Sequence, residues 1–225
     1  MGNFLDRTIK VLGIDKVDSF NDKVILVAGI GGVGGTALEA LARSGFSKFI
    51  LIDFDKVDES NLNRQILFLR KDIGKDKLDV AKEKLLEINP DIEVKLIKEK
   101  IDTNSLKDLN EKIDFVIDAI DYVPGKLELI QFALNKNIPF ISSLGMGNRI
   151  DPTKVSICKL NQTEGDPLAR KIRYECRLLG LELSKINVVF SKEAPLIKSK
   201  TPGSMMMVPS SAGLSIARYV IENLK

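Results

Sequence analysis

The chain has 225 residues, 44% of them hydrophobic, and a net charge of +3, which predicts one globular domain with a buried core. It has no histidine and only two cysteines, Cys158 and Cys176, so serine–histidine triads, a CxxC zinc site and a disulfide framework are excluded. The N-terminal residues lack the apolar region of a signal peptide, and no apolar run approaches the ~18 residues of a membrane span. We therefore expect a cytoplasmic protein with no membrane partner.

Strands and helices alternate through the first half of the chain. Short apolar, β-branched runs predict the strands, and apolar residues at helical spacing predict the helices between them. The expected strands are Val24–Ala28, Phe49–Asp53, Ile92–Ile97, Phe115–Ala119 and Ile138–Ser142, and the expected helices are Thr36–Arg43, Leu78–Ile88 and Gly125–Lys136. This alternation indicates an α/β fold with a Rossmann-like, doubly wound and mostly parallel sheet.

The pattern changes after Gly145, where we expect a smaller antiparallel and helical C-terminal part within one domain that spans residues 1–225. Residues 151–225 hold 12 Lys and Arg against 7 Asp and Glu, which suits an anionic partner or an ordinary solvated surface. The expected elements are the strands Val155–Leu160 and Asn187–Phe190, the helices Asp166–Leu179 and Ala212–Leu224, and a loop over Pro195–Pro209.

A glycine loop follows the first expected strand in the stretch VILVAGIGGVGG. Gly29, Gly31, Gly32 and Gly34 lie where a strand ends and a helix begins, so backbone N–H groups and the helix dipole are available to a phosphate. Asp53 ends the second strand, where a carboxylate usually meets a ribose hydroxyl. The pattern predicts a nucleotide site without separating NAD from ATP; a tight strand–helix crossing with no ligand is the alternative.

The segment after Asp53, DFDKVDESNLNRQILFLRKDIGKDK, favours ATP over NAD. Cations and amides suit a triphosphate, and acidic groups remain for the ribose or Mg²⁺. A nicotinamide enzyme has no need of arginine just past its ribose carboxylate, so an NAD(P)-dependent oxidoreductase is the weaker interpretation. The polar side chains expected near the carboxyl ends of the strands are Asp55, Asn61, Arg64, Gln65 and Lys77.

Four motifs in order, GIGGVGG, LIDFDKVDESNLNRQ, GKDK and DAID, resemble the ubiquitin-activating-enzyme-like adenylyltransferases over roughly residues 1–145. The resemblance implies an enzyme that binds ATP and Mg²⁺ and makes an acyl-adenylate from a carboxylate, with release of pyrophosphate. In that family the matching loop glycines seat the nucleotide. Arg64 and Lys77 match its phosphate-binding cations, and Asn61 and Gln65 match positions that line the same site.

Two further residues take roles from the same resemblance. Asp121, the second aspartate of DAID, matches a Mg²⁺-associated carboxylate, although a helix N-cap is an alternative role for it. Arg7 in LDRTIK matches an arginine that the family donates across a dimer interface, which implies a homodimer. Adenylation needs charge neutralisation and in-line placement more than a general base, so the absence of histidine is no obstacle.

The second half resembles one branch of that family, the tRNA threonylcarbamoyladenosine dehydratases, through the stretches IDPT, DPLARKIRYECR and VVFSKEAP. The branch adenylates the carboxylate of threonylcarbamoyladenosine in the tRNA anticodon loop. The carbamoyl group of the same side chain then closes a ring, with net loss of water. The resemblance also admits a sulfur-transfer partner protein. The alternative is adenylation of the C-terminal glycine of a ubiquitin-like or sulfur-carrier protein.

A basic helix is the expected RNA contact, so residues 146–225 are interpreted as the tRNA-facing and dimerisation part. At 100° per residue one stripe of the helix is cationic and the opposite face is apolar, although an ordinary amphipathic surface helix has the same pattern. The two cysteines fall on apolar elements, so neither is expected to be catalytic. The cationic residues are Arg170, Lys171, Arg173 and Arg177.

Overall fold

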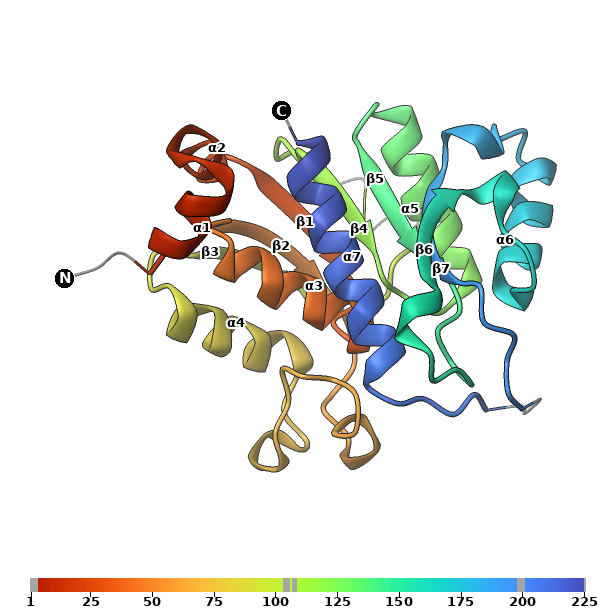
Figure 1. The fold of residues 1–225 in the computed structure, drawn as a ribbon, viewed down its shortest axis with the longest axis horizontal. Coiled ribbons are helices and arrows are strands. Elements are labelled where there is room, and N and C mark those ends of the chain that lie inside the picture. The colour runs from red at the N-terminus through yellow and green to blue at the C-terminus, as the bar shows by residue number, and fades with distance from the viewer. Residues whose placement is uncertain (1–3, 103–105, 107–108, 198–200, 225) are drawn as a thin grey trace.

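The computed structural model describes residues 4–102, 106, 109–197 and 201–224, and within them it contains one seven-stranded sheet (Figure 1). The strands are β1 (Val24–Ala28), β2 (Lys48–Ile52), β3 (Glu93–Ile97), β4 (Phe115–Asp118), β5 (Phe140–Ser143), β6 (Val155–Lys159) and β7 (Asn187–Ser191). The helices are α1 (Asp6–Leu12), α2 (Ile14–Asp18), α3 (Gly32–Arg43), α4 (Lys77–Ile88), α5 (Val123–Asn135), α6 (Pro167–Leu178) and α7 (Met207–Asn223).

The strand order is β3-β2-β1-β4-β5-β7-β6, and every neighbouring pair is parallel except β6 with β7. The expected α/β class is therefore confirmed, including the antiparallel extension at one edge. Chain order reverses between β1 and β4, because β1 leads outward to β2 and β4 leads outward to β5. In doubly wound sheets this reversal opens a crevice at the carboxyl ends of the strands.

Two hydrophobic clusters cover the two faces of the sheet and give the molecule three layers (Figure 1). Helices α3, α4 and α7 supply the first cluster, and α5 and α6 supply the second together with the segment around Leu109. The central strands are buried along almost their whole length, as expected for parallel strands covered on both sides. Helices packed on both faces therefore support the carboxyl edge of the sheet.

Helix α7 begins at Met207, within the stretch expected to be a loop, so the last part of the Pro195–Pro209 prediction is wrong. Pro209 is tolerated there because it lies in the first turn of the helix, where its missing N–H has no partner to lose. The helix packs closely on α3, since a Cβ placed on Gly213 would lie 2.5 Å from the carbonyl oxygen of Val33. This contact brings the C-terminal part of the chain back to the glycine loop.

Helices α1 and α2 were not expected, because their short segments are interrupted by Gly13 and bury little: α1 has no buried residue. The other expected helices and strands are present, with ends shifted by a few residues. No helix in the described ranges has the length and apolar character required to cross a membrane.

Candidate active site

A cavity of about 900 Å³ opens at the carboxyl edge of the sheet, where the chain order reverses. Its lining falls into two groups, the N-terminal half of the pocket between residues 29 and 122 and the C-terminal half between residues 143 and 209. The structure brings most predicted nucleotide-binding residues together in the N-terminal half. These are Gly29, Gly31, Gly32, Asp53, Asp55, Asn61, Arg64, Gln65, Lys77 and Asp121.

The glycine loop turns sharply between β1 and α3. Gly29 adopts a φ of +85°, which a residue with a side chain rarely does. A Cβ on Gly34 would lie 1.9 Å from the carbonyl oxygen of Gly29, so Gly34 lets α3 start directly against the loop. Gly34 does not line the pocket. The space beside Gly31 is open, because a Cβ placed there would have Gln65 Nε2, at 3.8 Å, as its nearest neighbour.

Asp53 fixes the glycine loop as well as facing the pocket. One carboxylate oxygen accepts the N–H of Ile30 at 2.7 Å, and the other accepts the N–H of Asp55 at 2.9 Å. The side chain is buried, so these two bonds offset the cost of desolvating its charge. Asp53 therefore connects the end of β2 to the loop, a role that its spacing to the glycines did not indicate.

Two cationic side chains, Arg64 and Lys77, also line the N-terminal half of the pocket. Lys77 is 5% exposed, and its Nζ lies 2.8 Å from the carboxylate of Asp55. Arg64 donates to the Ser60 carbonyl oxygen at 2.7 Å and to Asn63 Oδ1 at 3.0 Å, which leaves donors of its guanidinium available at the pocket. Their positions suit an anionic group held between them and the start of α3.

Gln65 carries an unmatched polar atom in this half. Its Oε1 is buried and has no hydrogen-bond partner among the described residues. A buried oxygen without a partner costs free energy, so such atoms commonly mark a place where a ligand or water binds. This acceptor, the open space at Gly31 and the two cations together fit a nucleoside triphosphate.

Asp121 lies at the pocket rim, exposed, and does not cap a helix, because the N-cap of α5 is Tyr122 and no side chain caps it. No cluster of three or more His, Cys, Asp or Glu side chains suited to a metal occurs in the described part of the chain. A Mg²⁺ at this place would therefore need ligands from the nucleotide and water besides Asp121, which is common for that ion.

A buried ion pair beneath the rim was missed by the sequence reasoning. Asp118, the first aspartate of DAID, accepts from Lys126 Nζ at 2.9 and 3.0 Å and from Ser142 Oγ at 2.5 Å, and the Lys and Asp side chains are fully buried. Burial raises the pKa of Asp118, while Lys126 and Ser142 oppose that rise. The group joins β4, α5 and β5 beneath the pocket floor.

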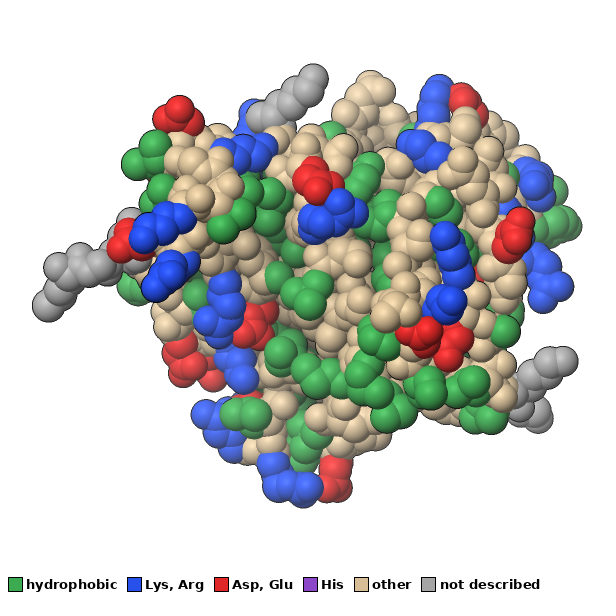
Figure 2. Space-filling model, viewed as in Figure 1, with side chains coloured by type: hydrophobic (Ala, Val, Ile, Leu, Met, Phe, Trp, Pro, Cys, Tyr) green, Lys and Arg blue, Asp and Glu red, His purple; other side chains and the backbone are tan. Residues whose placement is uncertain are grey.

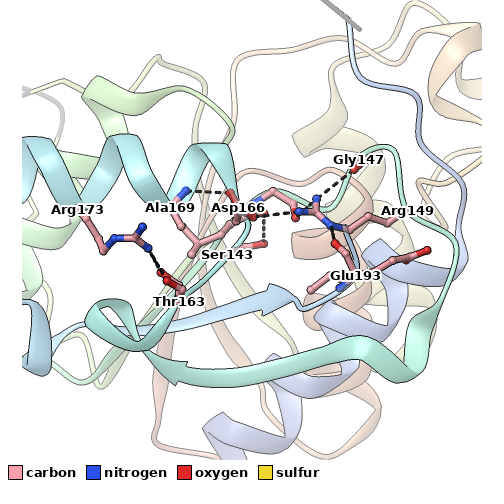
Figure 3. Close-up of polar contacts among 11 residues, drawn as sticks. Ser143, Gly147, Arg149, Thr163, Asp166, Ala169, Arg173 and Glu193 are labelled. Atoms are coloured by element: carbon pink, nitrogen blue, oxygen red, sulfur yellow. Dashed lines mark hydrogen bonds and ion pairs between the residues drawn. The ribbon is translucent and has the colours of Figure 1, made fainter. Parts of the chain in front are cut away.

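The C-terminal half is organised by Arg149, which is 4% exposed (Figure 3). Its guanidinium donates to the carbonyl oxygens of Gly145 at 2.7 Å, Gly147 at 3.1 Å and Glu193 at 2.8 Å. It also lies 3.6 Å from the carboxylate of Asp166. No local sequence pattern indicated this residue, because its partners come from three separate segments, residues 145–147, Asp166 and Glu193.

Asp166 connects the same group to α6. Its carboxylate caps the helix by accepting the N–H of Ala169 at 2.9 Å, and it accepts the N–H of Gly145 at 3.0 Å (Figure 3). The first residues of α6, Pro167 and Leu168, line the pocket. The start of the basic helix is therefore part of the pocket wall.

The basic helix has the expected sidedness with one difference. Arg170, Lys171 and Arg177 are exposed, whereas Ala169, Ile172 and Cys176 are buried. The difference is Arg173, which was also predicted to contact RNA. Its guanidinium is half-buried and donates to the carbonyl oxygen and Oγ1 of Thr163 (Figure 3). A helical wheel cannot show this bond, since Thr163 lies outside the helix.

A segment of the C-terminal half lies between two asparagines. Asn148, in a left-handed conformation with φ of +60°, exchanges two hydrogen bonds of 2.7 Å with Gly203. Asn63, next to Arg64, donates to the carbonyl oxygen of Ser204 at 2.8 Å. Residues 201–204 therefore contact both halves of the pocket, the C-terminal half through Asn148 and the N-terminal half through Asn63.

Arg7 and the two cysteines lie away from the pocket lining. Arg7 is exposed on α1, and its predicted role across a dimer interface stays a prediction. Burial raises the pKa of the Cys158 thiol, and it raises that of Cys176 to about 11. Neither thiol is placed or activated as a nucleophile.

The fold and the glycine-loop pocket define the class of protein. The model of the ThiF family matches residues 5–177, so the chain belongs to the ThiF family.

Similar proteins of known activity narrow the comparison to one branch of the family. The chain is 34% identical to the tRNA threonylcarbamoyladenosine dehydratase of Bacillus subtilis, over 97% of this chain and 93% of that protein. It resembles a crystal structure of the Escherichia coli tRNA N6-threonylcarbamoyladenosine dehydratase in complex with ATP, with a TM-score of 0.92 and 33% identity, over 97% of this chain and 92% of the other. The AMP complex of the E. coli enzyme matches with a TM-score of 0.92 and 34% identity, over 96% and 91% of the two chains.

Proposed function

We propose that the protein is an ATP-dependent tRNA threonylcarbamoyladenosine dehydratase, which adenylates the carboxylate of this modified nucleoside in the anticodon loop and allows it to cyclise. The observation that carries the proposal is the continuous pocket of about 900 Å³. One half has the loop, carboxylate and cations suited to a nucleotide, and the other half leads to the basic helix. The similarity to dehydratases over nearly the whole chain supports the same assignment.

ATP is a substrate in this reaction, and the residues of the N-terminal half fit it. The N–H groups at the start of α3 and the open space at Gly31 accommodate phosphate, and Asp53 faces the ribose. Arg64 and Lys77 neutralise the phosphates, and Gln65 gains the partner that its buried oxygen lacks. We assign Asn61 and Asp55 to the same wall, the latter holding Lys77 in place.

The chemistry follows from where the charges lie. The carboxylate of the acceptor attacks the α-phosphorus of ATP, the bond to the pyrophosphate breaks, and Arg64 and Lys77 stabilise the charge on the leaving group. The carbamoyl group of the same side chain then attacks the activated carbonyl carbon. AMP departs with one carboxylate oxygen, and a proton is released. Neither step uses a nucleophile of the protein, so the thiols of Cys158 and Cys176 have no part in them.

The remaining assignments belong to the same proposal. Mg²⁺ would be held by Asp121 with phosphate oxygens and water, a donor set that the ion prefers. A second copy of the chain would donate Arg7. Exposed hydrophobic side chains before and at the start of α7, including Leu196, Met205 and Met206, offer a surface for it (Figure 2). We place the reaction in the cytoplasm, with residues 1–145 binding the nucleotide and residues 146–225 facing the tRNA and the second copy.

Mass spectrometry of tRNA nucleosides tests the proposal directly. Incubation of tRNA that carries threonylcarbamoyladenosine with the protein and ATP should yield a nucleoside lighter by one water, together with AMP and pyrophosphate. The same incubation without ATP, or with unmodified tRNA, should give none of these three products. Unchanged nucleoside in the complete reaction would contradict the proposal.

Adenylation of a sulfur-carrier protein is the second candidate, because the chain is 33% identical to the E. coli sulfur carrier protein ThiS adenylyltransferase. That similarity covers 62% of this chain and 56% of that protein, less than the similarity to the dehydratases. Pyrophosphate exchange separates the two candidates. Exchange that requires modified tRNA supports the dehydratase, and exchange that requires a carrier with a Gly-Gly tail supports the second candidate.

A further inference from the structure

The outer face of α6 combines three cations with an exposed aromatic ring. At 100° per residue, Arg170, Lys171, Tyr174, Arg177 and Leu178 fall within an arc of about 120°. Tyr174 is 59% exposed and Leu178 is 66% exposed, and Lys and Arg side chains stand beside hydrophobic ones at this edge of the molecule (Figure 2). We call these five residues the outer face of α6.

The cationic side chains of this face have no acidic partner within ion-pair distance among the described residues. Among the described residues, Arg170, Lys171 and Arg177 form no ion pair, and Tyr174 makes no ring contact. Arg173 is different, because its Nη1 donates to Thr163 and holds the half-buried side chain against the segment before α6. The face therefore places three cations that make no ion pair around one aromatic side chain, an arrangement complementary to a nucleic-acid strand with unpaired bases.

The face has a fixed position relative to the pocket. Asp166 caps α6 and joins it to Gly145, and the buried Arg149 lies against the same carboxylate (Figure 3). With a rise of about 1.5 Å per residue, Tyr174 lies roughly 9 Å along the helix from Leu168 at the pocket wall. A nucleotide held in the pocket therefore has its neighbours, and not a distant stem, within reach of Tyr174.

We propose that the outer face of α6 docks the RNA strand that flanks the reacting nucleotide, with Tyr174 stacking on an unpaired base and Arg170, Lys171 and Arg177 binding phosphates. Sequence-tolerant stacking on an aromatic ring is how proteins hold unpaired RNA bases, and anticodon loops present such bases. This inference rests on the proposed function, since it takes the acceptor to be an RNA loop.

Binding of a labelled anticodon stem-loop RNA to the full chain without ATP tests the inference. Tyr174→Ala should weaken the affinity by about tenfold, the loss of one stacked base, while Tyr174→Phe keeps the ring and should bind within about twofold of the parent. Leu86→Ala, which removes an exposed side chain of α4, serves as the matched control and should change nothing. A duplex of the same stem without the loop should not distinguish Tyr174→Ala from the parent.

Salt dependence separates phosphate contacts from stacking. Arg177→Ala should reduce the slope of log affinity against log salt by about one, whereas Tyr174→Ala and Arg173→Ala should leave the slope unchanged. Wild-type affinity in Tyr174→Ala, or a reduced slope in Arg173→Ala, would overturn the inference while the cyclisation of tRNA still stands. If the parent protein neither binds the RNA nor cyclises modified tRNA, the proposed function fails as well.

Discussion

The two halves of the pocket both contain arginine, but they use it differently. In the N-terminal half, Arg64 keeps guanidinium donors at the cavity and Lys77 faces it beside Asp55. In the C-terminal half, Arg149 donates from Nε and Nη1 to three carbonyl oxygens of the protein, and its buried Nη2 lies 3.6 Å from the Asp166 carboxylate without a hydrogen bond. The comparison indicates that one half is built to neutralise a ligand and the other to hold a shape for it. An arginine-to-alanine substitution should therefore lower the rate of adenylation in the N-terminal half and the free energy of unfolding in the C-terminal half.

The largest effect should follow loss of the buried arginine. Arg149→Ala removes the buried charge partner of Asp166 and the donor to three carbonyl oxygens, so the free energy of unfolding should fall by about 3–5 kcal/mol. Urea denaturation followed by circular dichroism measures the change. Arg218→Ala, which removes an exposed ion pair with Glu222, is the control and should cost about 0.5 kcal/mol or less. A loss below ~1 kcal/mol in Arg149→Ala would mean that this half does not depend on the arginine.

The second largest effect is expected on the rate of adenylation, when Arg64 is replaced. Arg64→Ala should lower the rate of adenylation about 10²–10³-fold, because one donor to the leaving pyrophosphate is lost, with little change in the free energy of unfolding. Arg70→Ala, six residues further on, removes an exposed pair with Glu59 and should leave the rate unchanged. Pyrophosphate exchange with modified tRNA measures both. Equal rates in the two variants would show that Arg64 does not contact the phosphates.

The smallest effect is expected from the cysteines of the C-terminal half. Burial raises the pKa of the Cys176 thiol to about 11 and also shields it from solvent, so iodoacetamide should alkylate it slowly at pH 8 in the native protein. The rate should rise with pH, because the thiolate fraction grows as the pH approaches the pKa. Both thiols should react readily in urea, and a Cys158→Ala, Cys176→Ala variant should keep cyclising tRNA within about twofold. Loss of cyclisation in a double variant that still folds would show that one of the cysteines takes part in the reaction.

Local patterns were sufficient to predict the sheet and the N-terminal half of the pocket. Parallel strands are buried on both faces and read as apolar runs, and Gly29, Asp53 and Lys77 occupy fixed places relative to those strands. Their roles toward the nucleotide stay predictions, but their common location in the pocket followed from topology alone.

The C-terminal half depends on contacts that no local pattern contains. Arg149 meets Asp166 and Glu193 only after β5, β7 and α6 have assembled. Arg173 shares a helix stripe with Arg170 and Arg177, and only the chain outside the helix shows that it is bonded to Thr163. Periodicity identifies the side of a helix that is polar, but not which of its polar groups the protein already uses.

The close packing of α7 on α3 has a consequence for biosynthesis. Pro209 of α7 lines the pocket, and Gly213 meets the first turn of α3 at Val33. A nascent chain emerging from the ribosome therefore lacks part of the wall around its phosphate loop until residues 207–223 have been translated. A binding site formed before α7 has packed on α3 would lack this part of its wall.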